Sequence, residues 1–208
     1  PIKSLHKELE ASGLRNLKLK TYLGDEWFSP EGTLSISIPF WLANKKLRSI
    51  EFDKMKSVEG GTAPWCMRLL RHEAGHCFDH AYEVSRTRRW QRLFGNPKAP
   101  YDPDNYRVDR NSRDFVSNLE RGYAQSHPDE DFAETFAVCL NPKSNWRRRY
   151  CDRPKALAKL EYVDSLIKCY GGYLPVKSES SEMCSARKMT QTVNNYYSYR
   201  KKRTVTLY

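Results

Sequence analysis

Apolar and polar residues alternate with two different periods along this chain of 208 residues. Residues 16–22 and 33–38 alternate one by one, which predicts two β-strands. Other segments repeat their apolar residues every three or four positions, which predicts amphipathic helices. These helices are predicted over residues 4–12, 63–83, 85–94, 113–119 and 153–170. Residues 95–107 contain four glycines or prolines and predict a loop. Together these elements predict an α+β fold.

The helix predicted over residues 63–83 has a well-defined buried face. Thr62 and Pro64 suit its first positions, because threonine caps helix starts and proline fits the first turn. Its apolar residues recur at spacings of three and four: Met67, Leu70, Ala74, Cys77, Phe78 and Ala81. The neighbouring face of the helix is therefore free to carry metal-binding or catalytic side chains.

That neighbouring face carries His72 and His76, one turn apart, with Glu73 between them. Two histidines at this spacing can bind one Zn²⁺ while the glutamate moves protons, which is the arrangement of a zinc hydrolase. The alternative is a pair of core or surface histidines beside an incidental glutamate. A third metal ligand elsewhere in the chain would favour the zinc site over this alternative.

The position of the third ligand separates the classes of zinc hydrolase. One class has a glycine and a third histidine within six residues of the second, but Asp79 and Tyr82 occupy those positions here, which excludes it. His80 is about 12 Å from His72 along a straight helix, too far to share its metal. We therefore expect His80 to be a neighbouring or ordinary surface group.

An acidic segment at residues 126–138 offers a better third ligand. Its helix begins at Pro128, so Glu130 and the acids beside it have a simpler explanation as first-turn charges. Glu134 lies one turn further on among apolar residues, where an unpaired carboxylate would be costly. Glu130, 54 residues beyond His76, can reach a metal while Glu134 accepts the free ring N–H of a ligand histidine.

The two motifs, residues 72–76 and 130–134, together resemble those of the gluzincin metallopeptidases. The nearest groups are the lethal-factor-like peptidases and the bacterial "putative zinc-binding metallopeptidase" family. In the latter, an Arg-His-Glu-x-Gly-His segment is similar to residues 71–76, and a Tyr-x-x-x-His-Pro-x-Glu-Asp-x-Ala-Glu-Thr segment is similar to residues 123–135. Weaker similarity extends over residues 5–140. Members often carry an amino-terminal cysteine-rich segment, and nothing like it precedes residue 60.

The resemblance implies a zincin-like metallopeptidase domain with a small sheet beside the His-Glu-x-x-His helix. Its activity would be zinc-dependent hydrolysis of peptide bonds in a peptide or protein substrate. The implied zinc ligands are His72, His76 and Glu130. Glu73 would be the general base that deprotonates a metal-activated water, and Glu134 the partner of a ligand histidine. Zinc hydrolysis of a non-peptide amide stays open.

Tyr123 matches a tyrosine that in lethal-factor-like enzymes helps to stabilise the transition state. A phenol suits this role because it donates a hydrogen bond to a developing oxyanion. Packing at a helix start is the alternative, and His127 is a second nearby donor that we expect to be structural. If residues 33–38 form the sheet edge above the cleft, a substrate peptide can pair with them.

Gly171 and Gly172 mark the end of the compact unit, which predicts a metallopeptidase domain at residues 1–172 and a basic tail at residues 173–208. The net charge is +11, of which the tail contributes +5 from seven Lys or Arg and two Glu. Its tyrosines lie beside Arg200 and three further basic residues and can stack on nucleic acid or contact an acidic partner. A solvated tail is the simpler alternative. The competing function is therefore a nucleic-acid or acidic-protein binding module with a structural or vestigial zinc.

The amino-acid composition indicates the cellular compartment of the protein. The sequence has no apolar run of membrane-spanning length, so no membrane association is expected. Its six cysteines form no C-x-x-C pair, which favours free thiols in a reducing, cytoplasmic compartment. The sequence begins at Pro1, so an upstream signal removed by processing is also compatible with it.

Overall fold

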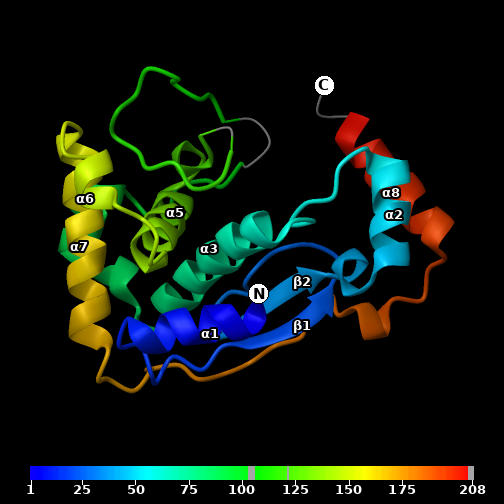
Figure 1. Ribbon diagram of the computed structural model, residues 1–208, viewed down its shortest axis with the longest axis horizontal. Coiled ribbons are helices and arrows are strands. Elements are labelled where there is room, and N and C mark those ends of the chain that lie inside the picture. Colours follow the sequence, from blue (N-terminus) through cyan, green and yellow to red (C-terminus); the bar gives the residue numbers. More distant parts are fainter. Residues whose placement is uncertain (103–105, 121, 206–208) are drawn as a thin grey trace.

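A long helix, α3 (Ala63–Tyr82), runs through the middle of the molecule and carries both histidines (Figure 1). The computed structural model describes residues 1–102, 106–120 and 122–205, with side chains as far as residue 201. Thr62 caps the helix by accepting a hydrogen bond from the Trp65 amide at 3.4 Å. The predicted apolar stripe is confirmed, because Leu70, Ala74, Cys77, Phe78 and Ala81 are buried.

The sheet contains two parallel strands, β1 (Lys20–Gly24) and β2 (Ser35–Pro39), in register from Lys20 opposite Ser35. It lies against α3 near α1 (Ile2–Ala11), as Figure 1 shows. The two predicted strands exist, each ending one or two residues later than expected. The α+β class is therefore confirmed for the described residues.

The expectation that a substrate peptide pairs with residues 33–38 is not met, because β2 is not a free edge. β1 pairs with one side of β2, and Phe28 forms an antiparallel bridge to Ser37 on the other, accepting the Ser37 amide at 2.8 Å. The carbonyl of Thr33 also lies 3.1 Å from Nδ1 of His80. All five residues of β2 are buried.

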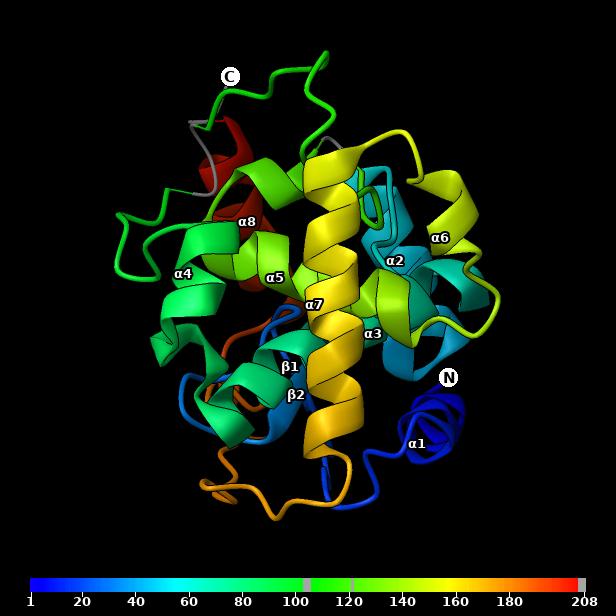
Figure 2. The same ribbon diagram turned by 90° about the vertical axis from the view of Figure 1, so that its left-hand side faces the viewer.

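Helix α5 (Pro128–Leu140) packs across α3, and α7 (Pro154–Tyr170) covers the other side of α5 (Figure 2). Helix α3 comes close to α5 at Gly75, where an added Cβ would lie 2.8 Å from Cα of Ala133. Only glycine allows this approach. The main core then forms between these helices and the sheet from Phe78, Phe132, Phe136, Ile36 and Leu70, among others.

The other helices differ more from the prediction. They are α2 (Lys45–Met55), α4 (Arg88–Phe94), α6 (Trp146–Arg149) and α8 (Val193–Val205). The helix predicted over residues 85–94 is broken at Thr87, which separates a 3₁₀ turn from α4 and caps α4. Residues 113–119 were predicted as a helix, and this is wrong, since they form an irregular segment. The predicted loop at residues 95–107 is irregular where the structure describes it, and residues 103–105 lie outside that part.

The segment after residue 172 packs against the rest of the chain. Its helix α8 lies beside α2 (Figure 1), where Tyr196 and Tyr197 are buried against Trp41. These two rings are therefore not available to stack on nucleic acid, whereas Tyr199 is 63% exposed. The basic side chains from residue 202 onward lie outside the described part. The division of the chain at residue 172 stays a prediction.

Two further properties concern the compartment. No helix among the described residues is both long and apolar enough to cross a membrane. All six cysteines are free thiols.

Candidate metal centre

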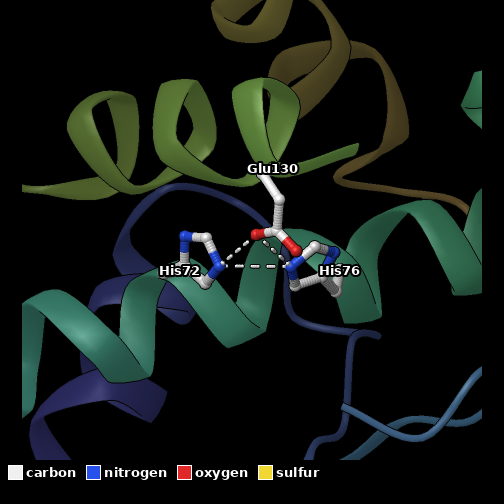
Figure 3. A group of neighbouring side chains, drawn as sticks. All are labelled: His72, His76 and Glu130. Carbon is white, nitrogen blue, oxygen red and sulfur yellow. Dashed lines mark hydrogen bonds and ion pairs between the residues drawn. The ribbon is translucent and has the colours of Figure 1, made fainter. Parts of the chain in front are cut away.

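Three side chains from two crossing helices point at one another in the candidate metal centre (Figure 3). Helix α3 contributes His72 and His76, and α5 contributes Glu130 from its first turn. The two Nε2 atoms are 3.2 Å apart, and Oε2 of Glu130 lies 3.0 Å from Nε2 of His72 and 3.3 Å from Nε2 of His76. The structure therefore brings together the three ligands predicted from the sequence.

The size of this triangle fits a zinc ion. Two ligand atoms that are each 2.0–2.1 Å from a tetrahedral zinc lie about 3.3–3.4 Å from one another. The three edges, 3.0, 3.2 and 3.3 Å, are close to that separation. Two imidazoles and one carboxylate also form a donor set that zinc prefers, and three protein ligands leave the fourth position open.

The hydrogen bonds around the triangle also indicate that a cation binds within it. An ionised carboxylate only accepts, so His72 donates from Nδ1 to Oε1 of Glu134 at 2.9 Å and keeps its lone pair on Nε2. That lone pair faces Oε2 of Glu130, a buried atom with no hydrogen-bond partner among the described residues. Two lone pairs at 3.0 Å repel, so a proton or a metal ion has to lie between them.

The charges around the three side chains also favour a bound proton or metal ion. Burial alone would lower the pKa of His72, but the carboxylates of Glu130 and Glu134 hold that pKa well above its usual value. Burial alone would raise the pKa of Glu130, but His76 and His72 hold it well below its usual range. The carboxylates and the imidazoles therefore stabilise each other's charged forms, which favours a proton held between them. A metal ion that binds here has to displace a proton.

Glu134 is the anchor of the site and is fully buried. Besides His72, its carboxylate accepts the side-chain amide of Asn118 at 2.9 Å and the backbone amides of Asn118 and Leu119 at 3.3 and 2.7 Å. These amides explain why residues 113–119 are not helical, because a helix would use them internally. Asn118 was not predicted from the sequence, and no local pattern marks it.

Glu73 lies beside the triangle and does not belong to it. It is buried, and its Oε2 has no hydrogen-bond partner among the described residues. Burial raises its pKa, while His72 and His76 oppose that rise. A buried carboxylate that is close to a cation site and makes no hydrogen bond through one oxygen is suited to exchange protons with a ligand.

Two tyrosines form a chain above Glu130. The hydroxyl of Tyr101 lies 2.9 Å from Oε1 of Glu130 and 3.0 Å from the hydroxyl of Tyr123, whose ring is 5.6 Å from that of His72. Burial, together with the charge of Glu130, raises the pKa of both phenols, so both remain protonated at neutral pH. Tyr123 was predicted near the metal, and Tyr101 was not, because the loop around it has no periodic pattern.

His127 and His80, two of the remaining three histidines, have separate structural contacts. His127 accepts the amide of Asp129 at Nδ1 and lies 3.0 Å from the carbonyl of Ala99 at Nε2, so both of its nitrogens are used at the start of α5. It is therefore not a free donor to the site. His80 lies one turn beyond His76 and contacts the carbonyl of Thr33, just before β2, as a group outside the ligand set.

A buried ion pair fixes the start of α5 from the opposite side. Lys159 of α7 donates to Oδ2 of Asp131 at 2.6 Å and to the carbonyl of Asp114 at 3.0 Å. Asp131 is adjacent to the ligand Glu130 and points away from the metal centre toward α7. The first-turn acids therefore have different roles: Glu130 faces α3, and Asp131 holds α5 against α7.

Comparison with known proteins supports the resemblance seen in the sequence. Residues 67–146 match the model of a family described as "Putative zinc-binding metallo-peptidase". The matched segment contains all three ligand candidates and both glutamates beside them. No curated protein and no solved structure matches the chain. The likeness to lethal-factor-like peptidases stays a prediction.

The matched family and the geometry agree on the metal. The family is described as zinc-binding, and His72, His76 and Glu130 form a largely buried group that can hold a metal ion. The description of the family also names a peptidase.

Proposed function

We propose that this protein is a zinc-dependent peptidase of the gluzincin type with a zincin-like fold. The observation that supports this most is the open triangle of His72, His76 and Glu130 beside the buried carboxylate of Glu73. Among the described residues, the group that can hold the metal contains three side chains. Three protein ligands are typical of catalytic zinc, whereas structural zinc usually has four.

The metal would supply Lewis acidity to this site, polarising a scissile carbonyl and making a water more acidic. The chain's own groups complete the reaction. Glu73 takes a proton from the attacking water and later delivers it to the leaving amine. Its raised pKa supports this double role, because a carboxylate that is too acidic does not hold the proton between the two steps.

Tyr123 is the proposed donor to the developing oxyanion. Its phenol is close to the ligand His72 and keeps its proton at neutral pH. A neutral donor stabilises the transition state without adding a charge to the substrate complex. Glu134 acts through His72, because it fixes the tautomer and the orientation of the ring.

Glu73→Gln tests the mechanism. Glutamine has nearly the same shape but does not accept a proton, so the variant should keep its zinc and lose most of its turnover, about 10²-fold or more. Zinc content by metal analysis and cleavage of an unbiased peptide library are the two measurements. Wild-type turnover in the variant would exclude Glu73 as the base, and loss of zinc would make it a ligand.

The competing function, a binding module with a structural zinc, predicts a different result. Removal of a structural zinc by a chelator would unfold the protein, and the library would remain uncleaved by wild-type protein. The same library experiment therefore separates the two functions. A profile of cleaved peptides would also identify the substrate preference.

A further inference from the structure

Tyr101 connects the irregular segment after α4 to the metal centre. Its ring is at the surface and the residue is 51% exposed, yet its hydroxyl reaches the buried carboxylate of Glu130 at 2.9 Å. The ring also packs edge-on against His127, with the centroids 5.3 Å apart, and His127 contacts the carbonyl of Ala99 at 3.0 Å. These contacts hold the hydroxyl in place from two sides.

The direction of the hydrogen bonds follows from the chemistry of the groups. An ionised carboxylate has no proton to donate, so the single proton of Tyr101 goes to Oε1 of Glu130. The oxygen of Tyr101 then accepts the proton of Tyr123 across 3.0 Å. The order is therefore Tyr123 to Tyr101 to Glu130, and each hydroxyl has one assigned acceptor.

The two oxygens of Glu130 consequently have separate partners. Oε2 faces the two histidines at 3.0 and 3.3 Å, and Oε1 receives Tyr101. A carboxylate without the second contact can rotate and approach the metal with either oxygen or with both. Occupying Oε1 removes that freedom before the metal binds.

We propose that Tyr101 is a positioning residue that holds Glu130 as a one-oxygen zinc ligand and keeps the Tyr123 hydroxyl engaged in the free protein. This inference rests on the proposed zinc site. It extends that site to a segment outside α3 and α5. Its second consequence is that Tyr123 has to leave Tyr101 before it donates to a substrate.

Tyr101→Phe removes the hydroxyl and keeps the ring against His127. Hydrogen bonds to a ligand carboxylate typically contribute 10- to 100-fold to metal affinity, so zinc should bind about 10- to 100-fold more weakly. Tyr123→Phe is the matched control, because it removes the neighbouring hydroxyl but leaves the bond from Tyr101 to Glu130. Its zinc affinity should stay within about threefold of wild type, which is small beside the effect expected of a ligand contact. Tyr199→Phe, at an exposed site in α8, controls for the substitution itself.

Competition with a chromophoric chelator measures zinc affinity at fixed pH, and the visible absorption of the Co²⁺-loaded protein reports ligand geometry. We expect a weaker affinity and a shifted Co²⁺ spectrum in Tyr101→Phe alone. Unchanged values in Tyr101→Phe, or an equal loss in Tyr123→Phe, would overturn the proposal. Neither measurement depends on turnover, so a wild-type protein that binds zinc but cleaves no peptide would refute only the peptidase function.

Discussion

Gly75 lies at the crossing of α3 and α5, and its replacement by alanine tests whether that crossing sets the geometry of the metal centre. An added Cβ would lie 2.8 Å from Cα of Ala133 and 3.1 Å from Cβ of Phe136. Ordinary contacts begin at 3.4 Å, so the backbone of α5 would have to move by about 3.4 − 2.8 = 0.6 Å to reach an ordinary contact. Because the closest atom belongs to the backbone, no side-chain rotation relieves the clash.

Two opposite effects on stability have to be combined. Overpacking costs about 1–3 kcal/mol, and replacing glycine by alanine inside a helix recovers about 1 kcal/mol. The net loss is then about 1 kcal/mol, which corresponds to a thermal midpoint about 2–4 °C lower for a domain of this size. This loss is measured in metal-free protein.

The effect on zinc should be larger than the effect on folding. His72 and His76 move with α3 and Glu130 moves with α5, so separating the helices opens the ligand triangle. Metal–ligand distances tolerate about 0.2 Å, roughly a third of the required displacement. We therefore expect zinc affinity to fall at least tenfold, or about 1.4 kcal/mol.

Gly172→Ala is the matched control, because an added Cβ there meets no atom within 4 Å. Chelator competition gives the zinc affinity, and thermal unfolding without metal gives the stability. Gly75→Ala should lose zinc affinity while Gly172→Ala retains it. If the two variants bind zinc equally well, the close approach of the helices does not determine the ligand geometry, and the reasoning is wrong.

Two further predictions concern supports of the fold. Glu134→Gln places an amide group against the donors of His72 and Asn118, so the free energy of unfolding should fall by about 1–3 kcal/mol and zinc should bind 10- to 100-fold more weakly. Thermal unfolding and chelator competition measure both, and an unchanged zinc affinity would show that Glu134 does not orient His72. Arg200→Ala removes the charged partner of the buried carboxylate of Glu51, 2.8 Å away, and should cost about 1–3 kcal/mol in urea unfolding with no change in zinc affinity. Exposed Arg148→Ala is its control, and equal unfolding curves would mean that this contact of α8 contributes no stability.

The helices that carry the ligands were predictable because local signals determine them. Threonine and proline at the start of α3, proline at the start of α5 and a regular apolar stripe all act within a few residues. Two of the three helices that were not predicted, α2 and α8, have no such stripe. The buried residue of α2 is the acid Glu51, and among the side chains of α8 described as far as residue 201 the buried ones are the adjacent Tyr196 and Tyr197, so neither shows an apolar period.

The predicted helix over residues 113–119 failed for a tertiary reason. Its pattern permits a helix, but the amides of Asn118 and Leu119 bind Glu134, and the amide of Ser117 binds the hydroxyl of Tyr150. These acceptors lie on distant parts of the chain. A local pattern contains no information about them, so it favoured the wrong element.

The two histidines of the metal site were recognisable from their local spacing alone. The spacing of His72 and His76 places two imidazoles on one face of a helix whatever the rest of the chain does, because the helical repeat is a local property. Glu130 was a candidate from its own motif, but its distances to the two imidazoles, and the contact of Tyr101 with its other oxygen, depend on how the chain packs. Glu130 lies 54 or more positions along the chain from the two histidines and 29 positions from Tyr101. These contacts exist because Gly75 lets two helices approach closely and because a loop returns over the helices. Packing of this kind leaves no signature in a local pattern of apolar and polar residues.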